Sequence, residues 1–292
     1  MRLLDKLGPV FVMGLLILIW GSSFILIKKA LMGLAPPMMA AFRIFFAALF
    51  ILPFGISRIR SVSFRQFRNI MFIAIAGTGI PAILFAYAQT KIPSAVAGSL
   101  NSLTPLCTFT VGYFIFGNRV SMRKILGIIV GLIGALILMG IDFSITSSFN
   151  SYSILVLIAV FCYGFSTNAI KYWSGDIPPL TIAGVGISII GIVALISLVY
   201  MDAWTAVSSH PLGYQSLACT ALLGMGSTAM ASVLYFWLNH KKGPIYASSA
   251  TYAIPVVAML WGVLDREALS MHNYIGMLLI LLGVFMITRD QS

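Results

Sequence analysis

Arg43 is a charged side chain that lies within an apolar run of the sequence, away from the ends of that run. A charge near the centre of a membrane helix costs about 2.5–3.5 kcal/mol on insertion scales, so Arg43 is expected to face protein or water instead of lipid. Two roles are open for it. It bonds to carbonyl or hydroxyl groups of a neighbouring helix, or it meets an anionic group such as a carboxylate on a substrate.

Two clusters of hydroxyl and amide side chains lie beside prolines, one at Pro105 and one at Pro255. A proline frees a backbone carbonyl, and this density of polar groups is costly against lipid, so both clusters predict a face that water reaches. The clusters contain Ser99, Asn101, Ser102, Thr104 and Thr108, and Ser248, Ser249, Thr251 and Tyr252.

Aromatic residues followed by glycine and hydroxyl side chains lie in the middle of two other apolar runs. One run contains Trp20-Gly21-Ser22-Ser23, and a later one contains Tyr163-Gly164-Phe165-Ser166-Thr167-Asn168. Small residues suit close helix packing, with the hydroxyls bonded back to their own helix. The same pattern also suits a face that lines a cavity.

A further pair of runs is interrupted at the centre, by Gly77-Thr78-Gly79-Ile80-Pro81 and by Gly224-Met225-Gly226-Ser227-Thr228-Ala229. Pro81 removes a backbone hydrogen bond and is expected to kink or loosen its helix. Tyr87 and Tyr235 end these runs at near-equivalent positions and are expected to cap the cavity. Trp237 is either an interfacial anchor or part of the same site.

We therefore expect a substrate site made of polar and aromatic side chains from several runs, with prolines as hinges. The candidate substrate-binding residues are Trp20, Ser23, Arg43, Thr78, Tyr87, Ser99, Asn101, Tyr163, Asn168, Tyr235, Trp237, Thr251 and Tyr252. The candidate hinges are Pro81, Pro105 and Pro255.

Enzymatic chemistry is disfavoured because every Asp, Glu and His falls in a tail or a connection. An intramembrane enzyme needs a nucleophile with its base, or metal ligands, gathered at depth, so no catalytic site, cofactor or metal is predicted. The sequence has no G-x-x-x-x-G-K-[ST] loop for ATP. Transport is expected to be facilitative or exchange-like, or else any proton coupling uses surface acids such as Asp265 and Glu267.

The elements that must position these residues are membrane helices. Of the 292 residues 60% are hydrophobic and 9% are charged, which is too apolar a composition for a soluble protein. Most of the apolar runs approach the ~20 residues of a spanning helix. About ten runs lie near residues 9–30, 36–56, 69–89, 93–116, 124–141, 153–173, 179–200, 215–239, 245–264 and 273–288.

The net charge of +11 arises mainly from Lys and Arg in the connections on one side of the predicted membrane. Cytoplasmic loops carry such an excess. The pattern predicts a multi-pass protein of the cytoplasmic (inner) membrane with both termini in the cytoplasm, and it accounts for the charge without a nucleic-acid partner.

The chain repeats one plan. The markers Pro105, Gly112, Ser121, Gly127 and Gly134 are spaced by 7, 9, 6 and 7 residues, and Pro255, Gly262, Ser270, Gly276 and Gly283 by 7, 8, 6 and 7. Five runs in each half make the second half enter the membrane from the opposite side, so we expect two inverted five-helix repeats, 1–146 and 147–292. The glycines Gly127, Gly131, Gly134, Gly276 and Gly283 predict helix packing or a homodimer.

These markers resemble the EamA-type branch of the drug/metabolite transporter superfamily. The resemblance rests on Trp20-Gly21, Lys28, Pro36 and Arg43, and on the Pro-x(6)-Gly…Gly pattern that ends both halves. The family's Gly-Glu pair before the last helix of each half is replaced by Gly117-Asn118 and Arg266-Glu267. The resemblance implies ten spans in two inverted repeats, a central cavity, and export of small metabolites such as amino acids.

We expect an all-α integral membrane protein that is a secondary transporter, exporting small amphipathic metabolites across the cytoplasmic membrane by alternating access. Its predicted partners are a small-molecule substrate and the lipid bilayer. The alternative is a non-transporting membrane sensor or assembly partner. The connections are short and leave no soluble domain to relay a signal, which disfavours this alternative.

Overall fold

A computed structural model describes residues 8–59, 62–117, 122–138, 150–173, 177–248 and 250–288, and all regular structure in these ranges is helical. The elements of the first half are α2 (Pro9–Ala30), α3 (Pro36–Ile59), α4 (Phe64–Ala74), η1 (Ile75–Gly79), α5 (Ile80–Ala88), α6 (Ser94–Asn101), α7 (Thr104–Phe114) and α8 (Met122–Leu138). Those of the second half are α9 (Ser153–Trp173), α10 (Pro179–Tyr200), α11 (Ala203–Ser209), α12 (Gly213–Leu222), η2 (Leu223–Met230), α13 (Ala231–Ser248), α14 (Ala250–Leu264) and α15 (Met271–Thr288).

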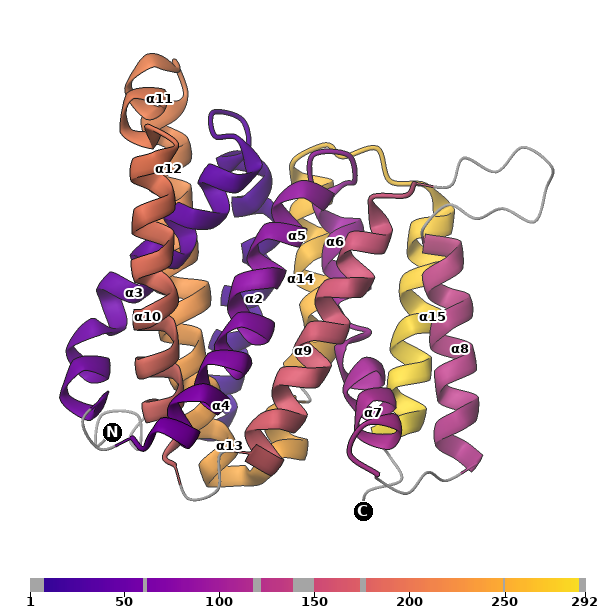
Figure 1. Ribbon diagram of the computed structural model, residues 1–292. Coiled ribbons are helices and arrows are strands. Elements are labelled where there is room, and N and C mark those ends of the chain that lie inside the picture. The colour runs from indigo at the N-terminus through magenta and orange to yellow at the C-terminus, as the bar shows by residue number, and fades with distance from the viewer. Residues whose placement is uncertain are drawn as a thin grey trace.

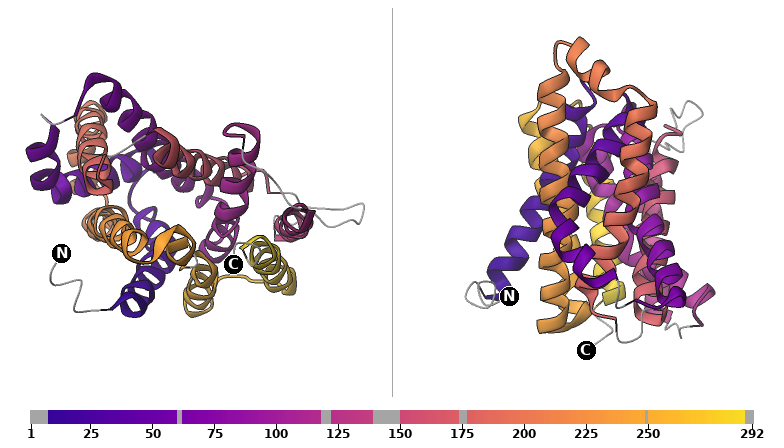
Figure 2. Two further views of the ribbon diagram at one scale, coloured as in Figure 1. Left: turned by 90° about the horizontal axis from the view of Figure 1, so that it is seen from below. Right: turned by 60° about the vertical axis from the view of Figure 1, so that its left-hand side comes forward.

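The long helices run roughly along one axis, and α2 begins at the same end of the bundle at which α15 stops (Figure 1). α3 packs along α10, and α8 packs along α15 at one edge of the bundle (Figure 2). Between these two pairs lie α2, α5, α6, α9 and α14, which contact one another across the two halves of the sequence.

Several helices are long and apolar enough to cross a membrane, which agrees with the predicted all-helical membrane protein. Among the described residues six segments meet both criteria, namely Pro9–Ala30, Pro36–Gly55, Phe64–Ala88, Ser153–Trp173, Leu180–Tyr200 and Gly213–Tyr235. Shorter apolar helices are Ile125–Leu138, Ala253–Leu264 and Met271–Met286. The count of ten spans and the inversion of the halves stay predictions, and the predicted boundary at 146–147 lies outside the described residues.

The predicted runs are less regular than their sequence suggests. The run near 93–116 is broken into α6 and α7, and Pro105 lies in the first turn of α7, where a missing N–H is least costly. Pro81 lies in the first turn of α5, directly after η1, whereas Pro255 lies inside α14. η1 and η2 are π-helical. Their backbone hydrogen bonds join residues five apart, so their turns are wider than those of an α-helix.

The glycines predicted to serve packing or a homodimer bring α8 and α15 together within one chain. A Cβ atom on Gly134 would lie 2.7 Å from the carbonyl oxygen of Gly276, and one on Gly283 would lie 2.5 Å from the carbonyl oxygen of Gly127 and 2.5 Å from the backbone nitrogen of Gly131. Only glycine permits this approach of the two backbones. These faces are therefore used for helix packing inside the chain, and a homodimer through them stays a prediction.

Candidate functional site

A cavity of about 230 Å³ lies at the centre of the bundle, between helices of the two halves. Its volume falls below the ~300–1,000 Å³ typical of drug-sized ligand pockets, so it suits a small metabolite. The wall is formed by Trp20, Ser23, Phe24, Ile27, Arg43, Gly77, Thr78, Phe85, Asn101, Thr104, Tyr163, Thr167, Ser227, Thr228, Ser232, Tyr235, Thr251 and Ile254.

Aromatic rings form much of this wall. The ring centroids of Trp20 and Tyr235 are 5.5 Å apart, and those of Phe85 and Tyr163 are 6.2 Å apart in a stacked arrangement. The Trp20 indole Nε1 also donates a hydrogen bond of 3.0 Å to the carbonyl oxygen of Ser227, which ties α2 to η2. The rings are thus held by packing and by this bond, and they form an apolar part of the cavity wall.

Arg43 reaches the cavity from α3, and its Nε donates a hydrogen bond of 3.0 Å to the Thr228 hydroxyl. Both predicted roles of Arg43 are therefore compatible with the geometry, because one edge of the guanidinium bonds to a neighbouring helix while the side chain lines the cavity. Among the described lining residues, no Asp, Glu, Lys or His accompanies it.

The two π-helical segments contribute corresponding parts of the wall, η1 through Thr78 and η2 through Ser227 and Thr228. Each needs a glycine for close contact. A Cβ on Gly77 would lie 2.4 Å from the Ser166 hydroxyl, and one on Gly224 would lie 2.5 Å from the Arg43 carbonyl oxygen. π-Helical turns occur often at functional sites because they redirect backbone and side chains.

The break between α6 and α7 supplies a third polar part of the wall, with Asn101 and Thr104 lining the cavity. The Thr104 hydroxyl donates to the Asn101 carbonyl at 2.6 Å, and the Ser102 hydroxyl donates to the Ser99 carbonyl at 2.6 Å. Pro105 has no N–H to donate to the Asn101 carbonyl, so the Thr104 hydroxyl takes the place of that donor, whereas the Ser99 carbonyl also accepts from the Ser102 backbone N–H at 3.1 Å.

Many of the side chains predicted to bind substrate meet at this cavity, although their binding role stays a prediction. Those that line it are Trp20, Ser23, Arg43, Thr78, Asn101, Tyr163, Tyr235 and Thr251. The side chain of Tyr252, like residue Ser249, lies outside the described part of the chain.

Four other predicted residues lie away from the cavity wall. Tyr87 is 42% exposed. Ser99 is buried and donates to the Ala95 carbonyl, and Asn168 donates to the carbonyls of Thr108 and Gly164. Trp237 is buried against α2 in a hydrophobic cluster. This position differs from that of an interfacial anchor, whose ring would be exposed at the end of the bundle.

Sequence reasoning missed several lining residues as individual candidates, namely Phe24, Ile27, Gly77, Phe85, Thr104, Thr167, Ser227, Thr228, Ser232 and Ile254. Five of them, Gly77, Thr104, Thr167, Ser227 and Thr228, belong to stretches singled out for their polar or small residues. The apolar members Phe24, Ile27, Phe85 and Ile254 carry no signal that separates them from ordinary packing residues.

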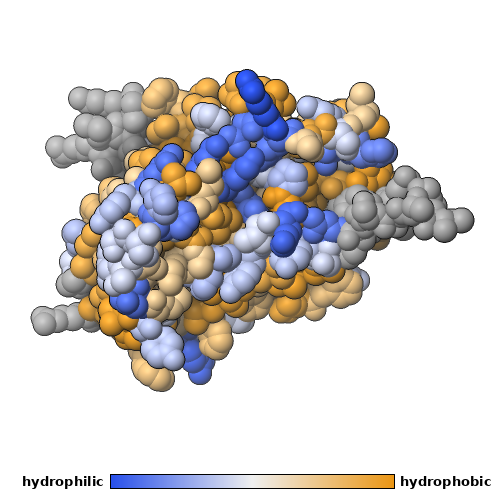
Figure 3. All heavy atoms as spheres, turned by 90° about the horizontal axis from the view of Figure 1, so that it is seen from above, coloured by the Kyte–Doolittle hydropathy of each residue, from blue (hydrophilic) through white to orange (hydrophobic). Residues whose placement is uncertain are grey.

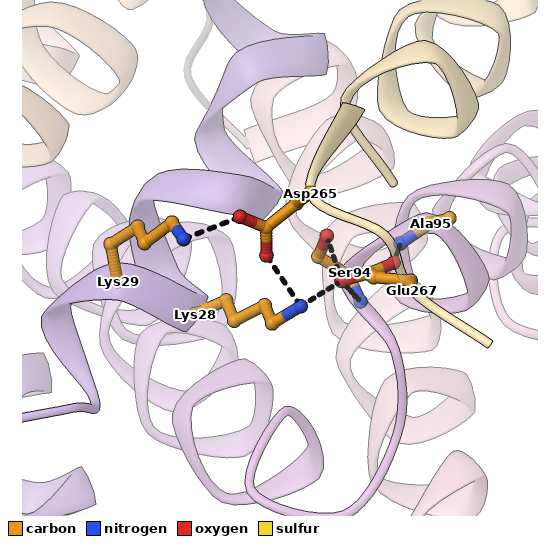
Figure 4. A network of polar contacts seen from close by, with 6 residues as sticks. All are labelled: Lys28, Lys29, Ser94, Ala95, Asp265 and Glu267. Atoms are coloured by element: carbon orange, nitrogen blue, oxygen red, sulfur yellow. Dashed lines mark hydrogen bonds and ion pairs between the residues drawn. The ribbon is translucent and has the colours of Figure 1, made fainter. Parts of the chain in front are cut away.

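An ion network lies at the end of the bundle where α2 stops and α6 begins (Figure 4). Asp265 bridges the two lysines, 2.6 Å from the Lys28 Nζ and also paired with Lys29. Glu267 lies 2.9 Å from the Lys28 Nζ. Hydrophilic residues gather in the middle of this end and hydrophobic residues surround them (Figure 3).

Glu267 also caps α6 from a distant part of the chain. Its carboxylate accepts hydrogen bonds from the backbone N–H of Ser94 at 3.0 Å, from the Ser94 hydroxyl at 2.7 Å and from the backbone N–H of Ala95 at 3.1 Å. Because the side chain is only 2% exposed, these donors replace water as its solvation. The α14–α15 connection is thereby tied to α2 and to the N-terminus of α6.

Acidification is expected to weaken this network. Burial raises the pKa of Glu267, but hydrogen bonds from Ser94, Ala95 and Lys28 outweigh burial and leave the pKa below its ordinary 4.5. Hydrogen bonds from Lys28 and Lys29 lower the pKa of Asp265 below its ordinary 3.8. Groups with lowered pKa values stabilise the folded state above their ordinary pKa, and this contribution disappears as the pH falls through the lowered value.

Thermal unfolding of the purified protein should therefore shift little between about pH 7 and pH 5 and then fall in more acidic buffer. The variant Glu267→Gln should flatten the acidic part of this profile. An unchanged profile in the variant would mean that other groups cause the acid sensitivity.

Comparison with known proteins supports a transport function. The family model for the EamA-like transporter family matches residues 7–140 and again residues 150–289. The chain is 27% identical to the uncharacterized inner membrane transporter YedA of Escherichia coli (strain K12), over 99% of this chain and 92% of that protein. It is 25% identical to the uncharacterized transporter YoaV of Bacillus subtilis (strain 168), over 94% of each.

A solved crystal structure superimposes with a TM-score of 0.61 at 17% identity, over 97% of this chain and 99% of the other, which shows a shared fold. The family and these relatives identify a multi-pass membrane transporter and not an enzyme. The chain belongs to the EamA-like transporter family.

Proposed function

We propose that the protein is a secondary transporter that exports small amphipathic metabolites, amino acids or similar solutes, across the cytoplasmic membrane by alternating access. The observation that carries the proposal is the central cavity, which is polar, aromatic and walled by helices from both halves. A polar hollow among membrane helices is costly unless water or a solute enters it.

Alternating access further requires two halves that can exchange conformations, which we propose to be inverted repeats over 1–146 and 147–292. The two separate family matches support this division. So does the pairing of corresponding helices, α3 with α10 and α8 with α15, together with the corresponding π-helical segments η1 and η2. In this mechanism Pro81, Pro105 and Pro255 are proposed hinges.

The ion network is the proposed closure of the cavity toward the outside. It lies at one end of the bundle, and the exposed Arg65 and Arg68 lie near the start of α4 at the opposite end (Figure 1). Because arginines concentrate on the cytoplasmic side, the proposed orientation places both termini in the cytoplasm and the network outside. Export would then require Lys28 and Lys29 to separate from Asp265 and Glu267.

Counterflow in proteoliposomes tests the mechanism. Vesicles preloaded with an unlabelled solute from a panel of amino acids and organic acids should accumulate the same labelled solute transiently, because exchange needs no ion gradient. An imposed pH gradient should leave the initial rate unchanged, since the described cavity wall has no acid or histidine.

Absence of counterflow for every solute that binds the folded protein would contradict alternating access. Gradient-driven uphill flux that survives Asp265→Asn and Glu267→Gln together would contradict the absence of proton coupling at depth.

A further inference from the structure

The charge of the central cavity is unbalanced. Arg43 brings a permanent positive charge to the wall, and the described lining residues include no carboxylate to neutralise it. Asp265 and Glu267 are engaged with Lys28, Lys29 and the N-terminus of α6, and neither lines the cavity. A guanidinium away from bulk water is stabilised chiefly by an anion, so this wall favours a ligand that supplies one.

The hydrogen bond of Arg43 leaves the ligand-binding edge of the guanidinium available. The bond to the Thr228 hydroxyl uses Nε, and among the described residues it is the hydrogen bond that this guanidinium makes. The terminal nitrogens Nη1 and Nη2 present the two parallel N–H groups that match a carboxylate. Thr228 therefore acts as a positioning residue, because its hydrogen bond to Nε fixes the orientation of the Arg43 guanidinium.

The same wall offers few hydrogen-bond acceptors and no negative charge to an ammonium group among the described residues. Three carbonyls in the irregular backbone beside the cavity already accept hydrogen bonds, Ser227 from Trp20, Thr228 from Ser232 and Asn101 from Thr104. The remaining polar groups are hydroxyls and an amide, which carry no net charge. An ammonium would lose its hydration without gaining a counter-ion, and it would enter beside the positive charge of Arg43.

The rest of the wall fits an apolar body attached to the anion. Phe24 packs edge-on against Phe85 with centroids 5.7 Å apart, and Phe85 stacks with Tyr163. Together with Trp20 and Tyr235, these rings offer a large apolar surface in a cavity of about 230 Å³. Such a surface contributes by excluding water from an aromatic or branched group of the ligand.

We infer that the substrate is a small organic carboxylate with an aromatic or apolar body and without an ammonium group. This inference rests on the proposed transport function and narrows its substrate class from amphipathic metabolites to organic anions. Arg43 receives the carboxylate, Thr228 orients the guanidinium, and the aromatic wall takes the apolar body.

A matched set of three probes tests the inference, namely hydrocinnamate, phenylalanine and phenethylamine. They share one phenylethyl body and carry a carboxylate alone, a carboxylate with an ammonium, or an ammonium alone. Binding to the purified protein in detergent should be tightest for hydrocinnamate. It should be about tenfold weaker for phenylalanine, because the added ammonium loses hydration without gaining a counter-ion and enters beside the charge of Arg43. Phenethylamine should not bind measurably.

Arg43→Gln should weaken the binding of hydrocinnamate by about tenfold or more and should remove the preference of the protein for hydrocinnamate over phenylalanine. Arg58→Gln is the matched control, because Arg58 also lies on α3 but donates to the Thr181 hydroxyl and does not line the cavity. It should leave all three affinities unchanged. If Arg43→Gln does not fold, the order of the three probes on the native protein still decides the question.

Tighter binding of phenylalanine or phenethylamine than of hydrocinnamate would overturn the inference, and so would an unchanged order in a folded Arg43→Gln protein. Its failure is distinct from failure of the proposed function. Counterflow of solutes with no carboxylate preference would sink the inference alone, whereas hydrocinnamate binding without any counterflow would sink the transport mechanism alone.

Discussion

Replacing Glu267 with glutamine is expected to destabilise the protein by about 3 kcal/mol, because hydrogen bonds to a charged group contribute about 1.5–3 kcal/mol each and the buried carboxylate accepts several of them from Ser94 and Ala95. The substitution keeps the size of the side chain but removes its charge from Lys28. It also turns one carboxylate oxygen into an amide group that cannot accept the hydrogen bonds of Ser94 or Ala95. Unfolding in denaturant, followed by tryptophan fluorescence in detergent, measures the change.

Asp265→Asn is the control within the same network. The Asp265 side chain is 19% exposed, against 2% for Glu267, and it bonds to lysines whose side chains are about one third exposed. Water can replace these contacts, so a loss of at most about 1 kcal/mol is expected. Equal effects of the two substitutions would show that the cap on α6 contributes nothing beyond the ion pairs.

Replacing Gly283 with alanine is expected to separate α8 from α15 and to destabilise the protein by about 3 kcal/mol, as strongly overpacked sites do. The added methyl carbon would lie 2.5 Å from the Gly127 carbonyl oxygen and 2.5 Å from the Gly131 backbone nitrogen. Backbone atoms cannot rotate away as a side chain can. The measurement is the midpoint of thermal unfolding together with the yield of folded protein in detergent.

Gly14→Ala is the matched control, since Gly14 lies on the exposed face of α2 and a Cβ there meets no atom within 4 Å. This change should be neutral or stabilising by up to about 1 kcal/mol, the helix preference of alanine over glycine. If Gly283→Ala instead leaves stability intact and turns a dimer into a monomer, the glycine stripe serves an interface between copies after all.

The sequence predicted the helical membrane protein and many residues of the cavity because those features have local signals. A charge inside an apolar run, as at Arg43, or a row of hydroxyls beside Pro105 is costly against lipid and therefore indicates a protein interior. The family match confirms the transporter class that the resemblance implies.

Features that depend on contacts between distant segments could not be predicted in this way. Glu267 caps α6 although it lies 173 residues after Ser94, the first residue of that helix. No local sequence pattern links the two. Trp237 ends a run like an interfacial anchor, yet α2 covers it and only 4% of it is exposed. Phe24 and Phe85 look like any core residue, because their place on the cavity wall is set by how the helices pack.

The wide turns of η1 and η2 have a consequence for how these helices can move. Each wide turn holds an extra residue that the helix absorbs locally, so the segments before and after it keep their rotational alignment. If such a turn tightened to α-helical geometry in the intact chain, the following segment would have to turn about its own axis by about 100°, the angle of one residue. In the span that ends with α13, this twist would carry Tyr235 away from Trp20, so the cavity could be remodelled by rotating a helix without tilting it.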